Sequence, residues 1–485
     1  MSRAPRPCRS PLLLAAAAQT FLLCSPSAAT HAATPVPIPT LSRPLPDPVR
    51  QGIGIWSVRK FGYSVTEYLV SGRANIYVPV SMADSRDFPS RDNVQDLKRH
   101  ASYRPKLKER SVPYTTRIVV YEPADPARFS GHVIFEVTHP AGGGRLTVWG
   151  KLSGFFISQR DAYVAIQHPL TFDSLRESDP RRYGALHAQD PSQLWGMVAQ
   201  VGALVRSASP QNPLAGYRIR SVFLTGYSYS GVVAATFADY YHDGARLPDG
   251  APIFNGYVPL ASQMYVRPLD VPVIRVNTQS DFNSFGALHN RGADSDAPGY
   301  RYRLYEVAGA SHVNASPTIL PSATAPRHYP RVEPRNLPHF SSQGCWAQFP
   351  RGAMPDTLPL YYVIAQAFIN MYRWVDQGIA PPRAPWLVTD ADGKAKLGAH
   401  GNALGGLRLP EISVPAATYG AGSGTCFLFG YERPFSSTEM RELYGTPTAY
   451  VQAVARAARQ DAAEGFLSAS SARHIIASAR AHASF

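Results

Sequence analysis

A serine, an aspartate and a histidine occur in this sequence where they could form a catalytic triad: Ser228, Asp281 and His312. A serine hydroxyl is a weak nucleophile at neutral pH. It attacks a carbonyl carbon efficiently when a histidine takes its proton and an acidic residue orients that histidine. Because each of the three residues closely follows a predicted strand, their order along the chain predicts nucleophilic cleavage of an acyl bond.

Ser228 lies in the segment GYSYSG, between a short apolar strand at Val222–Leu224 and a helical pattern that ends at Gly244. A nucleophile on such a strand-to-helix turn needs small residues two positions before and two positions after it. Gly226 and Ser230 meet this need, although a second glycine is more usual than a serine. Ser230 is the rival nucleophile, but the residue two positions before it is a serine, so the turn geometry favours Ser228.

The two partners of Ser228 follow later strands. Asp281 ends the segment TQSD after the predicted strand Val271–Asn277, and His312 ends the segment AGASH after the predicted strand Tyr302–Val307. In a parallel sheet the carboxyl ends of the strands meet at one edge, so these side chains are expected to converge. Glu306 is a poorer candidate for the acid because it lies inside a strand.

The negative charge that develops on the carbonyl oxygen needs hydrogen-bond donors, and these are worth several kcal/mol in a site shielded from water. The main-chain N–H of Tyr229, the residue after the nucleophile, is the first predicted donor. The second is expected from the loop after the strand His132–Val137, at Ala141 or Gly142. We also assign two neighbouring residues to the substrate pocket: His139 and Tyr227.

Other chemistries find little support in the sequence. The histidines show no H-E-x-x-H or other paired metal-ligand spacing, and G-x-x-x-x-G-K-[ST] does not occur. We therefore predict neither a metal ion nor a cofactor. The net charge of +14 is not concentrated in a basic segment interleaved with aromatic residues, so we predict no nucleic-acid partner. The sequence leaves the oligomeric state open.

The first 33 residues have the pattern of a cleavable signal peptide: early arginines, a short apolar run and then small residues. The apolar run is too short for a membrane-spanning helix, and no later stretch is apolar enough for stable membrane insertion. We expect a periplasmic or secreted protein. Cys345 and Cys426 would remain after cleavage and could form a disulfide in an oxidising compartment; two separate buried thiols are the alternative.

Apolar runs that alternate with helical patterns predict an α/β fold with a mostly parallel central sheet and helices on both faces. The short connection between the strands at Gly256–Leu260 and Val271–Asn277 leaves little room for a helix. Asp281 and His312 are expected on the loops that leave their strands. The arm from about Ala33 to Val49 is expected to have no structure of its own. Helices are expected around Leu152–Ser158, Tyr361–Val375, Thr438–Tyr444 and Ala449–Phe466. The chain is divided into four parts: a signal peptide at 1–33, an N-terminal arm and early strands at 34–113, a core at 114–314, and a covering loop with C-terminal helices at 315–485.

Several segments together resemble a large bacterial family, the alpha/beta hydrolase domain-containing proteins. They are the turn GYSYSG, the segment TQSD, the segment RLYEVAGASH and the late block HGNALGGLRLPEISVPAATY with ERPF after it. The resemblance implies an α/β-hydrolase fold with a C-terminal covering segment and serine-hydrolase activity on an unassigned substrate. Its motifs fall on Ser228, Asp281 and His312. Members often carry glutamine at the position of Tyr229 and glutamate at the position of Gln279.

The sequence therefore predicts an exported serine hydrolase that cleaves a small-molecule carboxylic ester through an acyl-enzyme. Two alternatives remain open at this stage. The same triad would serve an acyltransferase or an amidase, because only the acceptor or the leaving group differs. A protein that keeps this fold only for binding, without catalysis, is the other.

Overall fold

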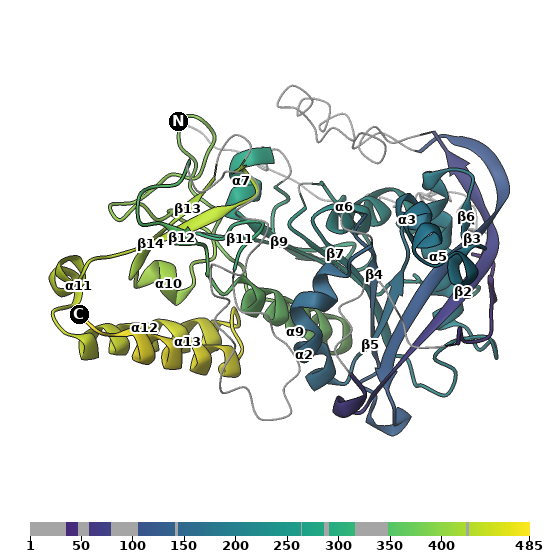
Figure 1. The fold of residues 1–485 in the computed structure, drawn as a ribbon, viewed down its shortest axis with the longest axis horizontal. Coiled ribbons are helices and arrows are strands. Elements are labelled where there is room, and N and C mark those ends of the chain that lie inside the picture. Colours follow the sequence, from purple (N-terminus) through teal and green to yellow (C-terminus); the bar gives the residue numbers. More distant parts are fainter. Residues whose placement is uncertain are drawn as a thin grey trace, which may run out of the picture.

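The computed structural model describes residues 35–46, 58–78, 105–140, 144–262, 264–285, 291–315, 348–422 and 426–485. A large twisted sheet runs through the molecule (Figure 1). In the described residues this sheet has eleven strands, with the order β1-β2-β3-β5-β4-β7-β8-β9-β11-β10 and β6 beside β3. The strands are β1 (Thr40–Leu41), β2 (Tyr63–Tyr77), β3 (Leu107–Pro123), β4 (His132–Val137), β5 (Ala162–Ile166), β6 (His187–Ala188), β7 (Ser221–Tyr227), β8 (Gly256–Leu260), β9 (Val273–Thr278), β10 (Ser295–Ala297) and β11 (Tyr300–Val307).

The middle of the sheet is parallel, as the sequence predicted. Strands β5, β4, β7, β8, β9 and β11 pair in parallel, and antiparallel strands flank them on both sides. Strands β4, β5, β7, β8 and β9 are buried along their whole length. Burial on both faces explains their continuous apolar runs, since neither face alternates with solvent. The carboxyl ends of these strands form one edge of the sheet, and this edge carries the predicted site.

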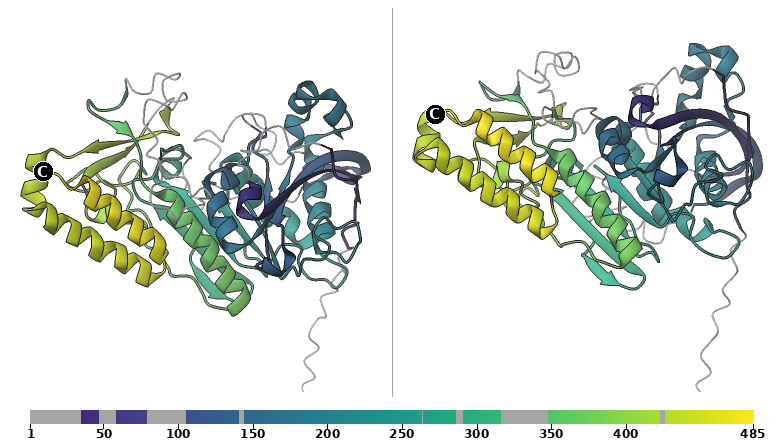
Figure 2. Two further views of the ribbon diagram at one scale, coloured as in Figure 1. Left: turned by 60° about the horizontal axis from the view of Figure 1, so that its bottom comes forward. Right: turned by 90° about the horizontal axis from the view of Figure 1, so that it is seen from below.

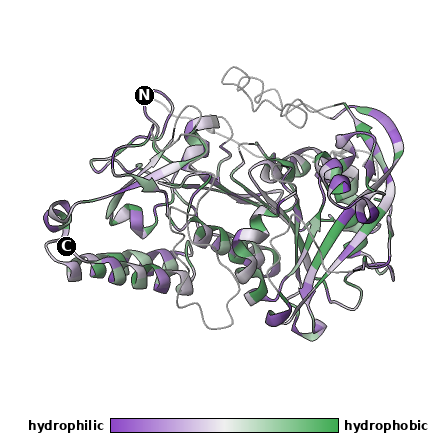
Figure 3. Ribbon diagram, in the orientation of Figure 1, coloured by the Kyte–Doolittle hydropathy of each residue, from purple (hydrophilic) through white to green (hydrophobic). Residues whose placement is uncertain are grey.

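Helices cover both faces of the sheet. Successive strand residues point to opposite faces, so Ile134 packs with one apolar cluster while Val133 and Phe135 pack with the other. The first cluster includes α2, α9, α12 and α13, and the second includes α5 and α6. Figure 3 shows apolar residues concentrated in the central strands and in α2. The helices are α2 (Thr147–Gln159), α3 (Phe172–Ser178), α4 (Pro180–Tyr183), α5 (Leu194–Arg206), α6 (Tyr229–Thr236), α7 (Gln279–Phe285), α9 (Leu360–Gln377), α10 (Pro410–Ser413), α11 (Ser437–Tyr444), α12 (Pro447–Glu464) and α13 (Ala469–His482).

The C-terminal region adds helices and a small sheet to the core. Figure 2 shows α9 between α2 and the pair formed by α12 and α13. Asn370 in α9 donates a hydrogen bond to the main-chain oxygen of Gly465, at the end of α12. The small antiparallel sheet has the order β12-β14-β13, with β12 (Met354–Pro355), β13 (Ala417–Ala421) and β14 (Gly430–Pro434). Most of the predicted covering loop, residues 316–347, lies outside the described residues.

Two sequence expectations need correction. The N-terminal arm was expected to have no structure of its own, but Thr40 and Leu41 form strand β1 and pair with β2. Asp281 was expected on a loop, but it lies in the first turn of α7. The helices near α2, α9, α11 and α12 were predicted correctly, and the connection from β8 to β9 has no helix in its described residues. The proposed signal peptide, residues 1–33, lies outside the described residues.

Candidate active site

The turn between β7 and α6 has the geometry that an exposed nucleophile needs. Ser228 has φ of 60° and ψ of −126°, a backbone conformation that is costly for a residue with a side chain. A Cβ atom at Gly226 would lie 2.2 Å from the main-chain oxygen of Ser230, and one at Gly231 would lie 2.3 Å from that of Leu260. Both positions therefore exclude any larger residue. Glycine at 226 was predicted for this reason, whereas the need for Gly231 was missed.

Ser230 has a structural role in the turn. Its hydroxyl accepts a hydrogen bond from the N–H of Tyr227 and donates one to the carbonyl of Tyr227, each at 2.9 Å. The residue is buried, whereas Ser228 is partly exposed. The serine that replaces the usual second glycine thus closes the turn on itself, and its hydroxyl is poorly placed for attack on a substrate.

Asp281 and His312 form a close, buried pair. His312 Nδ1 and Asp281 Oδ1 are 2.5 Å apart, and the side chains are 6% and 0% exposed. The other carboxylate oxygen of Asp281 accepts hydrogen bonds from the N–H and the hydroxyl of Thr278. This arrangement fixes the imidazole plane and keeps the proton on Nδ1, which leaves Nε2 as the basic nitrogen.

The segment TQSD also holds the main chain of the histidine loop. The side chain of Ser280 accepts a hydrogen bond from the N–H of His312 at 2.6 Å, and that of Gln279 accepts one from the N–H of Gly309 at 2.7 Å. Neither role was predicted from the sequence. Position 279 therefore serves as a hydrogen-bond acceptor for the loop, a task that an uncharged amide performs here.

Tyr227 connects the nucleophile turn with the histidine loop. Its hydroxyl donates a hydrogen bond to the main-chain oxygen of His312 at 2.7 Å, and the two rings lie 5.3 Å apart. Since Tyr227 directly precedes Ser228, this contact brings the turn and the loop together at the same edge of the sheet. No hydrogen bond joins Ser228 Oγ to His312 in the described residues. Such bonds often form fully only when a substrate is bound.

Aromatic side chains gather beside the predicted oxyanion donors. The ring of Tyr229 lies 6.1 Å from that of His139 and 5.5 Å from that of His168. His139 therefore lies next to the residue that follows the nucleophile, while Ala141 and Gly142 lie outside the described residues. His168 was not predicted from the sequence. Its place two residues after the end of strand β5, at the same sheet edge, is a signal that could have found it.

His168 is held in its neutral form. Its Nδ1 accepts a hydrogen bond from the N–H of Leu170 at 3.1 Å, so its proton resides on Nε2. Burial and, to a smaller extent, the nearby His139 lower the pKa of His168 to about 3. At neutral pH this imidazole is a hydrogen-bond donor without charge.

A buried glutamate fixes the start of α2, the helix that follows the predicted oxyanion loop. Glu136, at the end of β4, accepts hydrogen bonds from the main-chain N–H groups of Thr147, Val148 and Trp149. The hydroxyl of Thr147 donates to the same carboxylate and lies 3.4 Å from Ser230 Oγ. Burial raises the pKa of Glu136, and the hydrogen bonds only partly offset this. The helix start and the nucleophile turn are thus joined through side chains.

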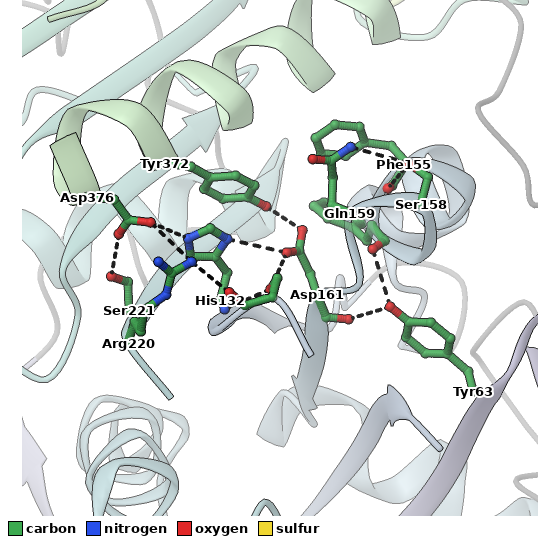
Figure 4. A network of polar contacts seen from close by, with 12 residues as sticks. Tyr63, His132, Phe155, Ser158, Gln159, Asp161, Arg220, Ser221, Tyr372 and Asp376 are labelled. Carbon is green, nitrogen blue, oxygen red and sulfur yellow. Dashed lines mark hydrogen bonds and ion pairs between the residues drawn. The ribbon is translucent and has the colours of Figure 1, made fainter. Parts of the chain in front are cut away.

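A second histidine–aspartate cluster lies at the opposite edge of the sheet, where the strands begin (Figure 4). His132 Nε2 is 2.8 Å from Asp376 in α9, and His132 Nδ1 is 3.5 Å from Asp161, just before β5. Ser221 contacts Asp376 and not the histidine. Both ring nitrogens of His132 therefore face carboxylates, and this group has no nitrogen left to activate a hydroxyl.

The rival acid and the two cysteines complete the residues considered from the sequence. Glu306, the rival acid, is bound by Arg291 through two hydrogen bonds of 2.7 Å and accepts a third from the N–H of Leu387. It is thus committed to a structural ion pair. Cys426 is buried, but Cys345 lies outside the described residues. The disulfide between them stays a prediction.

The described residues contain no group of three or more His, Cys, Asp or Glu side chains that could hold a metal ion. None of their helices combines the length and the apolar character of a membrane span. A cavity of about 510 Å³ lies between β2, α5 and the segment after α6, with Tyr77, Trp195 and Tyr241 among its walls. None of the predicted site residues lines it.

The comparisons with known proteins agree with this architecture. A family model described as "Alpha/beta hydrolase domain" matches residues 32–477. The chain belongs to this family. The match covers the nucleophile turn, the aspartate, the histidine and the C-terminal region, so the α/β-hydrolase fold predicted from the sequence is confirmed. A search of curated protein sequences finds no match.

Solved structures similar to this α/β hydrolase include three hydrolases. LpqC, a poly(3-hydroxybutyrate) depolymerase from Bordetella parapertussis, is 12% identical with a TM-score of 0.27 over 40% of this chain and 78% of its own. An alpha-beta serine hydrolase homologue from Coxiella burnetii is 15% identical with a TM-score of 0.26 over 41% and 84%. Esterase 2 from Thermogutta terrifontis is 13% identical with a TM-score of 0.26 over 39% and 77%. Such distant likenesses say nothing of this chain's substrate.

Proposed function

We propose that this α/β hydrolase cleaves a carboxylic ester, with Ser228 as nucleophile, His312 as general base and acid, and Asp281 as the residue that orients His312. The observation that carries the proposal is the pairing of a strained serine on the strand-to-helix turn with a buried histidine–aspartate pair on the contacting loop. The proposal rests on this geometry and on the family.

The reaction follows from these positions. Ser228 Oγ bonds to the ester carbonyl carbon while its proton passes to His312 Nε2, and the carbonyl oxygen becomes negatively charged. The N–H of Tyr229, at the amino end of α6, and one from the loop at Ala141 or Gly142 would stabilise that charge. The C–O bond then breaks, the alkoxide takes the proton from His312, and water releases the acyl group by the same steps.

A fluorophosphonate probe tests the nucleophile. The wild-type protein and Ser230→Ala should be labelled, and Ser228→Ala should not. Ser230→Ala is a matched control because it removes a hydroxyl two residues away. The loss of its two hydrogen bonds should cost about 1–3 kcal/mol of stability without removing the nucleophile. Labelling that survives Ser228→Ala would disprove the assignment. A folded wild-type protein that takes no label would favour the binding-protein alternative.

The substrate class is tested separately. Hydrolysis of p-nitrophenyl esters of increasing acyl length, compared with the matching anilides and with added alcohol acceptors, distinguishes an esterase from an amidase or an acyltransferase. We favour an ester because it is the least demanding leaving-group chemistry for this triad.

We also propose that residues 1–33 direct export and that Cys345 and Cys426 form a disulfide in the exported protein. The buried position of Cys426 and the pattern of the N-terminal residues support this. The mass of the mature protein, measured after alkylation with and without prior reduction, tests both points.

A further inference from the structure

A buried carboxyl group from the C-terminal region contacts the residue next to His312. Asp356 follows strand β12 and is fully buried. One of its carboxylate oxygens accepts hydrogen bonds from the N–H and the hydroxyl of Ser311, at 2.8 and 2.6 Å. The other accepts one from the N–H of Leu358 at 2.8 Å. Two of its three donors thus belong to the residue that directly precedes His312.

The main chain around Asp356 joins the same loop. Its carbonyl accepts a hydrogen bond from the N–H of Ala315 at 2.7 Å, and its own N–H donates to Gly430 at 3.2 Å. The N–H of Val313 donates to the carbonyl of Leu428 at 2.8 Å. Residues 311–315 therefore lie against the C-terminal region along their length, although the rest of the active site belongs to the core.

Hydrogen bonds, and not an ion pair, hold Asp356 in place. No ion pair to Asp356 occurs in the described residues. Burial raises its pKa to about 7 and the carboxylate of Glu432 contributes to the rise, while the bonds from Ser311 and Leu358 lower it. The negative charge of Asp356 also contributes to raising the pKa of two nearby tyrosines, Tyr227 on the core side and Tyr361 in α9. Burying a carboxylate without an opposite charge costs free energy of folding. The presence of Asp356 at this position therefore suggests that it has a role beyond stability.

We infer that Asp356 is a positioning residue for His312: the C-terminal region uses it to hold the loop of the catalytic base through Ser311. This inference rests on the proposed function and deepens it. Asp281, the acid of the triad, fixes the imidazole ring from the core, and Asp356 fixes the main chain that carries it. The C-terminal region then takes part in the reaction without touching substrate.

The substitution Asp356→Asn tests this with little change in size. An amide places an N–H₂ group where one oxygen accepts both hydrogen bonds from Ser311 or where the other accepts the one from Leu358, so at least one donor loses its partner. We expect kcat for p-nitrophenyl butyrate to fall about tenfold to a hundredfold with KM nearly unchanged, because a displaced base weakens the transition state and not the binding of the ester. Asp392→Asn, an exposed aspartate of the same region, is the matched control and should behave as wild type.

Ser311→Ala and the double variant show whether Asp356 acts through Ser311. Ser311→Ala keeps the N–H donor and should lower kcat by a smaller factor. If the two residues form one unit, the double variant should lose far less than the product of the two single losses. Two losses that multiply would overturn the route through Ser311, and kcat within twofold of wild type in folded Asp356→Asn would overturn the inference.

Hydrogen exchange separates this inference from the proposed function. In Asp356→Asn, the amides of residues 308–315 should exchange faster than in wild type and Asp392→Asn, and those of β7 should be unchanged. Faster exchange with an unreactive wild-type protein would support the positioning of the loop while the proposed function fails. Unchanged exchange of the loop would overturn the inference whatever the activity. Circular dichroism of each variant confirms that it is folded.

Discussion

His312 and His132, two of the buried histidines that pair with aspartates, differ in what surrounds the second ring nitrogen. His312 bonds to one carboxylate, that of Asp281, and its ring lies beside the turn that presents a serine. His132 has a carboxylate at each nitrogen, and its ring stacks on Tyr372 at 4.1 Å between centroids. The first lies where the parallel strands end, and the second where they begin.

The difference shows how a histidine suited to act as a base differs from one with a structural role. We call the structural group, His132 with Asp161 and Asp376, the His132 clamp. A histidine with one acidic partner keeps a nitrogen that can accept a proton and pass it on. A histidine between two carboxylates is stabilised in its charged form and has no nitrogen for a substrate. Burial lowers the pKa of His132, but hydrogen bonds and charge from Asp161 and Asp376 outweigh this and raise the pKa overall. His132 thus joins the start of the sheet to the end of α9.

The largest effect is expected from His312→Ala. Removing the base should lower kcat/KM for an ester by about 10⁴-fold or more, since members of a triad act as one unit. The fold should survive, because Asp281 keeps its two hydrogen bonds from Thr278. Ester kinetics and fluorophosphonate labelling measure the loss. If His132→Ala caused the same loss in a folded protein, the roles of the two histidines would have to be exchanged.

His132→Ala should reduce stability instead. It leaves Asp161 and Asp376 near one another without the cation between them, and breaking such a buried pair costs about 3–5 kcal/mol. Asp161 would keep the hydroxyls of Ser130 and Tyr372 as partners, which limits the loss. Urea unfolding measures the free energy, and kcat/KM of the folded variant should stay within about threefold of wild type. His187→Ala, at an exposed histidine, is the control. An equal loss of stability in that variant would contradict a specific stabilising role of His132.

The sequence marks the proposed base, His312, but not the cluster around His132, because only the first is signalled by residues close to it in the chain. The nucleophile turn, TQSD and AGASH are short segments, and each follows a strand that its own apolar residues reveal. The cluster around His132 depends on which strands are neighbours and on a helix far along the chain, and neither can be read from local spacing. The same reason explains why Asp356 was missed: its partner Ser311 is 45 residues away.

Other misses have local physical causes. Strand β1 has only two residues and forms because β2 offers an open edge, so no apolar pattern marks it. Helix α13 was also not predicted, although Ala472, Ile475 and Ala479 recur at helical spacing, the same kind of signal that predicted α12. The role of Ser230 was also hidden, since a hydroxyl that returns to its own turn looks in the sequence like a substitute for glycine.

A smaller effect, the pH dependence of stability, tests the clamp most directly. The pKa of His132 is raised in the folded protein above its ordinary value of 6.5. Its contribution to the free energy of unfolding is therefore fully present below about pH 6.5 and is lost as the pH rises through the folded pKa. The difference in unfolding free energy between wild type and His132→Gln should be largest below about pH 6.5 and should shrink as the pH rises above it, as urea titrations can measure.

The unfolding free energy of wild type has to be compared with that of His132→Gln at each pH, because other buried groups titrate in the same pH range. Burial raises the pKa of Glu122 to about 8 and that of Asp461 to about 7, and both contributions cancel in the comparison. Arg220 lies 3.4 Å from Asp376 and partly replaces the charge of His132, so the pH effect should be a fraction of the loss in His132→Ala. A difference that grows with pH would mean that His132 is neutral in the folded protein, and that its two carboxylates do not act as a clamp.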